Sequence, residues 1–419
     1  MNTLLHKFLL VLVVLAPLPL GSNREWAWTL CAFITAVIAL ARAVHSLVRP
    51  QQVSRSLNTL VIFLFLAVCT WAWLQTEAWM PFEWKHPLWS MNIYVQDWTL
   101  LGSISLSVED SLVALMRLLC YALVFFLAFQ FGRDREKAQA SLWWIAFAGF
   151  AYAIYGLIVY WGGFGTLFWF FDEGFKGDVR GTFVNRNSFA TYVGLSLLCA
   201  VAVFSQKVAR RQAPLGMPVS KEIRIERFVL LVWKPLIAIL LLTTALILTH
   251  SRGGFFSTLA AAMVLFYLLN RRQQRGSRKS KAALLGAVLV TVVAFVLTSE
   301  VLLQRIDRLT VDTEERMQVY EITAQAIDDN PLLGFGYGTY ADSFRLYRDD
   351  RLRAHFDMTH NTYLENVFEL GWPAAGVLFL CVAWLTLLCF RGAWTRGRDW
   401  VYPATGVAAT VLVAIHSFF

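Results

Sequence analysis

The stretch Thr359–Gly376 has the sequence THNTYLENVFELGWPAAG and opens an apolar run that continues to about residue 390. Polar side chains stand at its start, and two carboxylates, Glu365 and Glu369, follow four residues apart, which puts them on one face of a helix. Crossing the apolar core of a bilayer takes about 20 residues of helix. The run is long enough to do so, and we expect it to be a membrane helix whose first turns carry the carboxylates.

Similar apolar blocks recur along the whole chain. Of the 419 residues, 58% are hydrophobic and only 16% are charged, and the mean hydropathy is +0.54. A soluble domain of this size carries more charge and fewer apolar residues. We therefore predict an all-α polytopic membrane protein with about 11–12 transmembrane helices. The expected spans are 8–20, 26–45, 57–75, 111–131, 141–161, 187–205, 230–250, 255–270, 282–299, 361–390 and 400–419.

The predicted organisation has three parts. Residues 1–299 form transmembrane helices 1–9 with short loops, and 300–360 form one long helical loop. Residues 361–419 form the C-terminal transmembrane helices, the last of them cut short. The hydrophobic spacing in the long loop predicts two helices, Glu314–Asp329 and Asp342–Phe356.

The formal charge of +9 does not indicate a nucleic-acid partner. Basic residues gather in the loops that share one side of the membrane when the N-terminus is inside, and that asymmetry marks the cytoplasmic side. The run RRQQRGSRKSK (Arg271–Lys281) is expected to contact anionic membrane lipids. The loop 300–360 and His360 then lie on the outer face. Group transfer there needs an already activated donor, such as a lipid-linked diphosphate.

His360 is the first candidate for catalysis. Imidazole changes charge near neutral pH, so it can act as a general base on the outer face. It can also be a polar interface residue that caps the following helix, with Asn361 beside it. Glu365 and Glu369 are both candidates to orient the imidazole, although Glu365 also suits the first helical turn by its charge alone. These alternatives stay open at the level of sequence.

Two other stretches place arginine at the mouth of a predicted span. GDVRGTFVNRNSF contains Arg180, Asn185, Arg186 and Asn187, and HSRGGFF contains Ser251 and Arg252. An arginine at membrane depth is costly unless it meets an anion. The alternatives are helix capping by the asparagines and an interfacial arginine that reaches for the headgroups.

Other chemistry has less support in the sequence. The six cysteines all lie in apolar runs, which excludes a disulfide framework. No HExxH, DxD or carboxylate cluster at ligand spacing occurs, so we predict no metal and no cofactor. The GFGYG run (Gly334–Gly338) lacks a surrounding strand–helix unit, so we predict a tight turn instead of a dinucleotide site.

Four stretches together resemble the O-antigen ligase and polymerase superfamily of bacterial inner-membrane glycosyltransferases. The last of them is similar to the ligase signature of His, a small amide or hydroxyl residue, nine residues and Gly. Where the family often has a second Gly, this chain has Ala374. The likeness covers roughly residues 140–419. The stretches are RGTFVNRNSFA (Arg180–Ala190), THSRGGF (Thr249–Phe255), ERMQVYEIT with NPLLGFGYGTY (Glu315–Tyr340) and HNTYLENVFELG (His360–Gly371).

The resemblance implies a GT-C-like fold and an active site on the periplasmic face of the bacterial inner membrane. It implies metal-independent transfer of O-antigen glycan from undecaprenyl diphosphate to a lipid A–core hydroxyl. His360 would be the essential histidine, and Arg180 and Arg252 would grip the donor's diphosphate. A single displacement by a hydroxyl that His360 deprotonates would invert the anomeric carbon. The basic stripe expected on the second loop helix is a candidate for the acceptor's phosphates: Arg345, Arg348 and Arg351.

Three other functions compete with the ligase hypothesis. O-antigen polymerase and protein O-oligosaccharyltransferase use the same scaffold. A lipid-linked glycan transporter is a different class and would need charged residues along the centre of its helix bundle. The predicted spans are nearly free of charge, and the polar groups gather on one face, which favours an enzyme.

Overall fold

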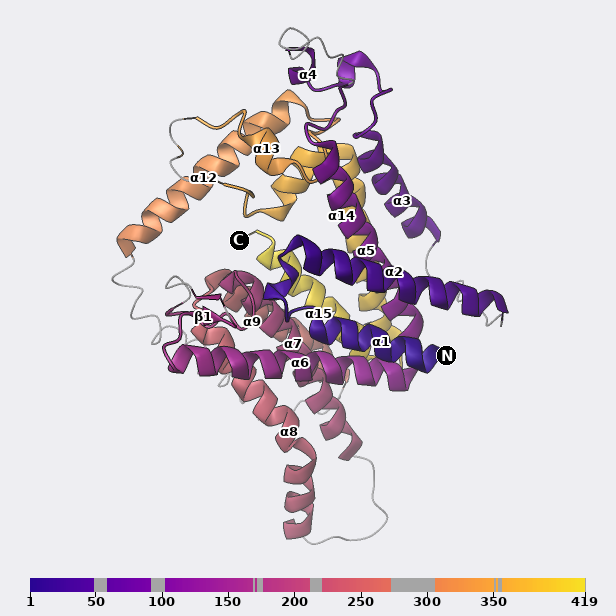
Figure 1. Ribbon diagram of the computed structural model, residues 1–419. Helices are drawn as coiled ribbons and strands as arrows, with labels where there is room; N and C mark the ends of the chain where they lie inside the picture. Colours follow the sequence, from indigo (N-terminus) through magenta and orange to yellow (C-terminus); the bar gives the residue numbers. More distant parts are fainter. Residues whose placement is uncertain are drawn as a thin grey trace. The chain divides into compact units, whose positions relative to one another are not determined.

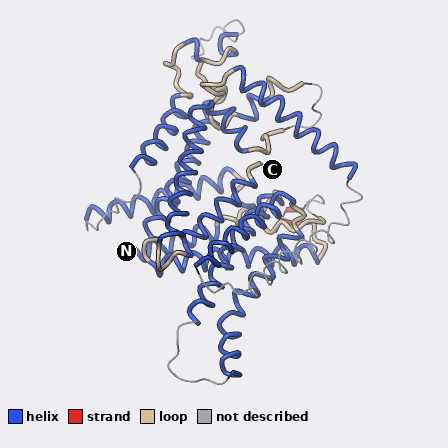
Figure 2. Tube along the Cα trace, turned by 180° about the vertical axis from the view of Figure 1, so that it is seen from behind, coloured by secondary structure: helices blue, strands red, loops and turns tan. Residues whose placement is uncertain are grey.

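The computed structural model describes residues 1–48, 59–91, 102–168, 170–171, 176–211, 221–272, 306–349, 352 and 356–418. Figure 1 and Figure 2 show that this part of the chain is helical almost throughout. One antiparallel pair of two-residue strands, β1 (Thr166–Leu167) and β2 (Phe170–Phe171), interrupts it. The first helices are α1 (Asn2–Leu15), α2 (Glu25–Val48), α3 (Thr59–Leu74), α4 (Leu88–Met91), α5 (Val108–Phe131) and α6 (Arg135–Trp161). The later ones are α7 (Arg186–Arg211), α8 (Lys221–Leu248), α9 (Arg252–Arg272), α12 (Ile306–Asp329), α13 (Tyr340–Phe344), α14 (Thr362–Thr395) and α15 (Val401–His416).

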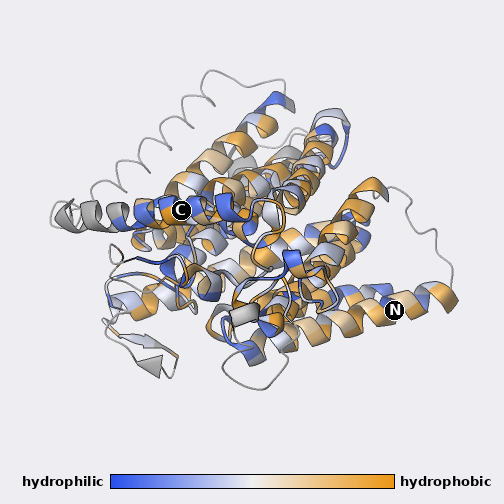
Figure 3. Ribbon diagram, turned by 90° about the horizontal axis from the view of Figure 1, so that it is seen from above, coloured by the Kyte–Doolittle hydropathy of each residue, from blue (hydrophilic) through white to orange (hydrophobic). Residues whose placement is uncertain are grey.

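Six described helices are long and apolar enough to cross a bilayer, and four shorter apolar helices accompany them. Hydrophobic residues predominate along these helices, as the hydropathy colours of the ribbon in Figure 3 show. On α2, for example, Phe33, Leu40 and Leu47 are 65%, 66% and 80% exposed. Water would penalise such a surface, whereas lipid chains accept it. The protein is therefore a polytopic all-α membrane protein, as predicted. The six are Glu25–Val48, Val108–Phe131, Arg135–Trp161, Arg186–Val208, Arg252–Arg271 and Thr362–Thr395.

The helices follow the predicted spans with shifted ends, and the expected span 282–299 lies outside the described residues. The first helix, for example, was predicted to continue to residue 20 and ends at Leu15. Pro17 and Pro19 cause this early end, because proline has no N–H for a helical hydrogen bond and its ring clashes with the preceding turn.

The loop between residues 300 and 360 contains one long helix, α12, where the first was predicted. The prediction of a second helix over Asp342–Phe356 is wrong, because α13 ends at Phe344 and turns follow. The Arg348 guanidinium closes this segment by donating to the Leu352 carbonyl at 3.2 and 2.8 Å. Phe344 and Leu352 are 1% and 2% exposed. Their apolar spacing reflects burial of a folded-back turn and not one face of a helix.

The chain forms two compact units. Unit 1 comprises Met1–Val48, Phe126–Leu303 and Thr386–His416, and unit 2 comprises Arg49–Phe125, Gln304–Leu385 and Ser417–Phe419. α5 and α14 contribute to both units.

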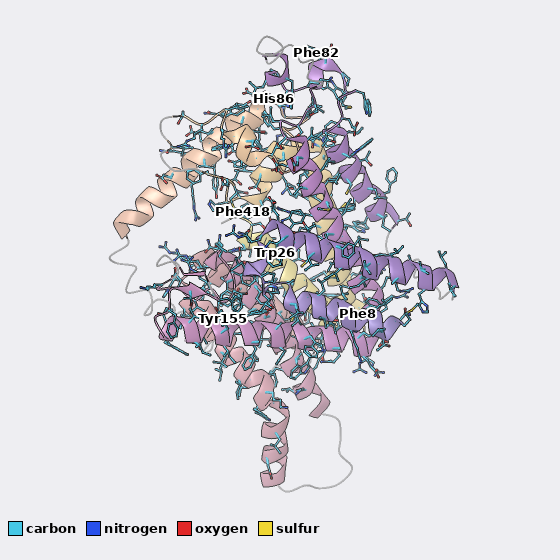
Figure 4. The ribbon with its side chains drawn as sticks, viewed as in Figure 1. Phe8, Trp26, Phe82, His86, Tyr155 and Phe418 are labelled. Atoms are coloured by element: carbon cyan, nitrogen blue, oxygen red, sulfur yellow. The ribbon has the colours of Figure 1, made fainter. Side chains whose placement is uncertain are left out.

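Unit 1 is built on α6, α7, α8, α9 and α15, which pack side by side (Figure 1). Small residues let these helices approach closely, as is common in membrane proteins. A Cβ atom on Gly254 of α9 would lie 2.4 Å from the Cβ of Ala190 on α7. A side chain of α6 also supports the hairpin: the Tyr155 hydroxyl (Figure 4) accepts a 2.8 Å bond from the Phe168 N–H. Close packing at these points fixes the loop ends that carry polar residues.

Unit 2 contains α3, α12, α13 and the first part of α14. Its core joins Val68 of α3, Ile322 of α12 and Phe368 of α14. Phe335 stacks on Phe368 with ring centroids 4.5 Å apart. The glycine-rich turn that carries Phe335 is therefore part of this core.

Candidate functional site

A break inside α14 shapes the polar end of unit 2. Gly371 has φ 76° and ψ 161°, which a residue with a side chain rarely adopts. A Cβ there would lie 2.3 Å from the Leu332 carbonyl oxygen. Pro373 lacks the N–H that would reach back to Glu369. The carbonyls of the turn before the break consequently lose their helical donors and need others.

The glycine-rich turn at residues 334–338 supplies those donors. The Phe335 N–H donates to the Phe368 carbonyl, and the Gly336 N–H donates to the Glu369 carbonyl, each at 3.0 Å. The Gln75 side-chain amide also donates to the Glu369 carbonyl, at 2.9 Å. Gly334, Gly336 and Gly338 all have positive φ. The predicted tight turn is therefore present, and it clamps the broken helix directly behind its first turns.

His360 sits in a turn that ends at α14. Its φ is 57°, in the left-handed region. The Thr359 hydroxyl accepts a 2.9 Å bond from the Asn361 N–H across the turn. The Asn361 side-chain oxygen accepts from the N–H groups of Tyr363 and Leu364 at 3.1 and 3.3 Å. Asn361 is thus the helix cap, which leaves the His360 imidazole available for another role.

The C-terminal segment supports the same turn from the other side. The Thr362 N–H donates to the Ser417 carbonyl at 2.9 Å. The rings of Tyr363 and Phe418 lie 4.5 Å apart, and Figure 4 labels Phe418 at this point. Both contacts belong to unit 2.

Glu365 and Glu369 hold different parts of this site. Glu365 Oε2 accepts from both the N–H and the hydroxyl of Thr359, at 3.2 and 3.1 Å. Glu369 is 5% exposed, and its Oε1 accepts a 3.1 Å bond from the Tyr340 N–H. Glu365 therefore acts on His360 through Thr359, whereas Glu369 fixes the segment that follows the glycine-rich turn.

The environment of His360 favours its neutral form. Burial lowers the pKa of the imidazole, and the positive charge of Arg316 lowers this pKa further. A histidine with a lowered pKa keeps a free lone pair at neutral pH. That is the form in which imidazole accepts a proton.

A second polar cluster lies in unit 1 and centres on Asp178, whose side chain is 6% exposed. Its Oδ1 lies 3.0 Å from His250 Nδ1, and its Oδ2 lies 2.9 Å from an Arg186 Nη atom. Arg180 contacts the same Oδ2 at 3.4 Å. Burial by itself would raise the pKa of Asp178, but the His250 hydrogen bond and the Arg186 charge outweigh it and lower this pKa. Asp178 is therefore an ionised carboxylate at neutral pH.

The loop that carries Asp178 is fixed by its backbone. The Val179 N–H donates to the carbonyl of Leu248 at the end of α8, at 2.9 Å. Arg180 donates from Nη1 to the Val184 carbonyl at 3.1 Å. These bonds hold the Arg180 guanidinium and the Asp178 carboxylate at one end of α8.

Two helices begin at this cluster. α7 begins at Arg186, and the Asn185 side chain accepts a 2.7 Å bond from the Asn187 N–H in its first turn. α9 begins at Arg252, and the buried Ser251 hydroxyl accepts from the Gly254 N–H at 3.2 Å. The predicted capping role of Asn185 is therefore confirmed, and Ser251 caps α9 in the same way without having been predicted to. Helix N-termini attract anions, so the surroundings of the arginines favour a negatively charged ligand.

The predicted site residues fall into two sets, one in each unit, and the predicted basic stripe belongs to neither set. Arg180, Asn185, Asn187, Ser251 and Arg252 lie in unit 1, and His360, Asn361, Glu365 and Glu369 lie in unit 2. The predicted basic stripe is not on a helix, because α13 ends at Phe344, and its contact with the acceptor stays a prediction. Arg345 pairs with Asp342 at 3.4 Å, Arg348 binds the Leu352 carbonyl, and Arg351 lies outside the described residues.

Asp178 and His250 were missed from the sequence, whereas Arg186 belongs to a stretch that the sequence already marked as a candidate anion site. A local signal for His250 exists: THS at residues 249–251 and THN at 359–361 form the same turn. The Ser251 N–H donates to the Thr249 hydroxyl at 3.2 Å, and His250 has φ 52°. Asp178 lies far from His250 in the sequence, so only folding reveals that they are partners.

The described residues hold no group of three or more His, Cys, Asp and Glu side chains arranged for a metal ion. The Asp178 carboxylate binds two guanidinium groups, those of Arg180 and Arg186, in addition to His250. Such a cluster attracts anions and repels metal cations. Independence from metal stays a prediction.

Residues 237–380 match a protein-family model described as O-Antigen ligase. The matched range contains His250, Ser251, Arg252 and the whole turn at His360, and Arg180 precedes it. No curated protein sequence matches the chain. The family match indicates an activity of the O-antigen ligase or polymerase type.

Proposed function

Because residues 237–380 of this chain carry an O-antigen ligase domain, we propose that the protein is an inner-membrane glycosyltransferase that works on the periplasmic face. It moves an O-antigen glycan from undecaprenyl diphosphate to a hydroxyl of lipid A–core. The observation that carries this proposal is the His360 turn. It presents a half-buried imidazole of lowered pKa, and a separate residue, Asn361, caps the helix.

The chemical step is a single displacement. The neutral His360 imidazole accepts the proton of the acceptor hydroxyl as that oxygen attacks the anomeric carbon of the donor's first sugar. The bond from this carbon to the diphosphate oxygen breaks, and its electron pair stays on undecaprenyl diphosphate. The new glycosidic bond forms on the opposite face, so the anomeric carbon inverts.

Arginines take the role that a metal ion has in many glycosyltransferases. Arg180 and Arg252 stabilise the charge that develops on the leaving diphosphate. Arg180 is held by Asp178 and the Val184 carbonyl, and Arg252 stands exposed at the start of α9. Removing one such donor raises the barrier by ~3 kcal/mol, which slows transfer by on the order of a hundredfold.

The acceptor's phosphates are assigned to Arg345 and Arg348, which are both exposed on the segment after α13. Replacing both with alanine should weaken affinity for lipid A–core and leave donor affinity unchanged. An unaltered acceptor affinity in this double variant removes the assignment.

The deciding experiment offers purified protein in nanodiscs a lipid-linked O-antigen donor together with one of three acceptors. These are lipid A–core, a second lipid-linked repeat unit and a pilin-type protein. Glycan on lipid A–core supports the ligase, whereas extension of the repeat or modification of the protein identifies the other two activities. Movement of intact donor across a sealed bilayer, without any transfer, identifies a transporter.

Two controls complete this assay. His360→Ala should abolish transfer, and His86→Gln should not, because the half-buried His86 ring accepts from the Leu88 N–H and packs against Phe335. Full transfer by His360→Ala disproves the general-base role. Loss of transfer in a chelator disproves metal independence.

A further inference from the structure

The cluster around Asp178 contains Arg180 of the proposed donor site together with His250 and Arg186. We propose that Asp178 holds His250 as a proton-dependent ligand for the donor's diphosphate, beside Arg180 and Arg186. The inference rests on the proposed function, because it takes the same lipid-linked diphosphate as its ligand. It adds two residues, His250 and Arg186, and a condition: the diphosphate binds together with one proton.

The backbone presents His250 as it presents His360. Each histidine has a left-handed φ, 52° at His250 and 57° at His360. In each turn the preceding threonine hydroxyl accepts from the N–H of the residue after the histidine. A non-glycine residue in this conformation costs about 1–3 kcal/mol, so surrounding contacts must maintain it. The chain adopts this unfavourable backbone conformation at both histidines, and each of them lies just before a helix.

Asp178 then fixes which nitrogen of the ring is available. It occupies Nδ1 at 3.0 Å, so Nε2 is the nitrogen left for a ligand. The His250 side chain is 20% exposed, compared with 6% for Asp178. The carboxylate is thus enclosed while the imidazole retains a path to a ligand.

A proton on His250 increases the positive charge of the cluster. Asp178 contributes −1, and Arg180 and Arg186, which contact it, contribute +1 each. An imidazolium at His250 adds +1 for the two negative charges of a diphosphate diester, in addition to the charge of Arg252 in the proposed donor site. The N-terminus of α7, at Arg186, adds a further attraction for anions.

The hydrogen-bonding capacity of His250 changes in the same direction. A neutral ring that donates from Nδ1 to Asp178 has a lone pair on Nε2, which repels a phosphate oxygen. A protonated ring donates from Nε2 as well, and such charge-assisted bonds are the strong ones. Imidazole is the side chain that changes charge between pH 5 and 8.

Among the other groups near His250, one could also take up the proton when the diphosphate binds. Asp178 is ionised, and lysine and arginine keep their charge in this range. The exception is His416 on α15, which hydrogen-bonds the Gly253 backbone in the first turn of α9. The charged or titratable groups of the packed elements are Lys176, Asp178 and Arg180 in the loop, Arg186 on α7, Arg252 on α9 and His416 on α15.

The test measures binding, so it does not depend on turnover. The probe is a diphosphate diester with a short prenyl chain and one sugar, because its two charges stay constant between pH 5.5 and 8.5. Isothermal titration calorimetry in two buffers of different ionisation enthalpy gives the number of protons taken up. For the wild type we expect close to one proton above neutral pH, and an affinity that falls up to tenfold per pH unit.

Two variants locate the proton. His250→Gln keeps a donor for Asp178 but cannot become charged, so it should bind without proton uptake and with no pH dependence. At pH 6 it should bind about tenfold more weakly than the wild type, which corresponds to ~1.4 kcal/mol. His416→Gln is the matched control and should keep the wild-type proton uptake.

Each result decides something. Proton uptake that persists in His250→Gln, or that disappears in His416→Gln, overturns the inference. So does a wild type that binds the probe with no uptake at any pH. If the wild type does not bind the probe at all, the diphosphate donor itself is wrong, and the proposed function falls together with the inference. If binding and uptake are as expected but no glycan is transferred, only the proposed transfer is wrong.

Discussion

Replacing Glu365 with alanine tests whether a partly buried carboxylate positions His360. Glu365 Oε2 accepts both the N–H and the hydroxyl of Thr359, the residue before the histidine. Alanine removes this acceptor and leaves the Asn361 cap of α14 intact. We predict that Glu365→Ala lowers kcat about thirtyfold and leaves the KM for the donor unchanged.

The magnitude follows from the turn. A hydrogen bond within a protein contributes about 1 kcal/mol net, so the two bonds to Glu365 contribute about 2 kcal/mol. The left-handed backbone of His360 costs about 1–3 kcal/mol, which these bonds help to offset. Losing them reduces the share of molecules with His360 in position by about thirtyfold, since 1.36 kcal/mol corresponds to a factor of ten.

Two further variants separate position from charge. Glu365→Gln keeps an oxygen that can accept both bonds from Thr359, and it should restore the rate to within about fivefold of the wild type. Asn366→Ala alters the next residue of α14, whose side chain binds only the carbonyl of Thr362, and it should leave the rate unchanged. Steady-state transfer in nanodiscs, with donor and acceptor each varied, gives kcat and KM separately.

A wild-type rate for Glu365→Ala refutes the positioning role outright. An equal loss in Glu365→Gln and Glu365→Ala also refutes it, because it shows that the negative charge matters and not the acceptor oxygen. A raised donor KM with unchanged kcat shows that the residue serves binding. Thermal unfolding of each variant excludes a general loss of fold as the cause.

Three other predictions concern separate features. Since the pKa of His360 lies below its ordinary value of 6.5, transfer should persist below pH 6.5 and should fall as the pH drops through that lowered pKa. Arg316→Gln removes one cause of the lowered pKa, so it should move the acid limb of the pH–rate profile to higher pH. Arg252→Lys should slow transfer at least tenfold in the nanodisc assay, because a point charge does not replace a bidentate fork, and a normal rate removes the diphosphate clamp. Gly371→Ala should lower the unfolding temperature, by an amount equivalent to about 1–3 kcal/mol, because its Cβ meets the Leu332 carbonyl; an unchanged midpoint contradicts the need for glycine.

The sequence by itself determined the features that depend on local composition. Apolar blocks of bilayer length predicted the membrane helices, because the cost of exposing the backbone to lipid leaves helices as the solution. The polar residues before α14 identified the His360 turn, and the arginine in HSRGGFF identified the start of α9. Capping patterns are local as well, which is why Asn185 caps α7 as predicted, although Asn361 and not His360 caps α14.

The tertiary structure alone decided which residues act together. Glu365 and Glu369 share a helix face, yet one binds Thr359 and the other binds Tyr340, because the break at Gly371 brings the glycine-rich turn against Glu369. The different partners of Glu365 and Glu369 depend on the backbone conformation at Gly371, which the spacing of hydrophobic residues does not predict.

The Asp178 cluster has the same origin. Its carboxylate meets His250 only because the Val179 N–H ties the loop to the end of α8. Ion pairs between segments remote in sequence form when packing brings the segments together, and their partners share no periodicity along the chain. The sequence therefore specified the membrane class and the separate polar residues, whereas packing determined the contacts that set their charge and orientation.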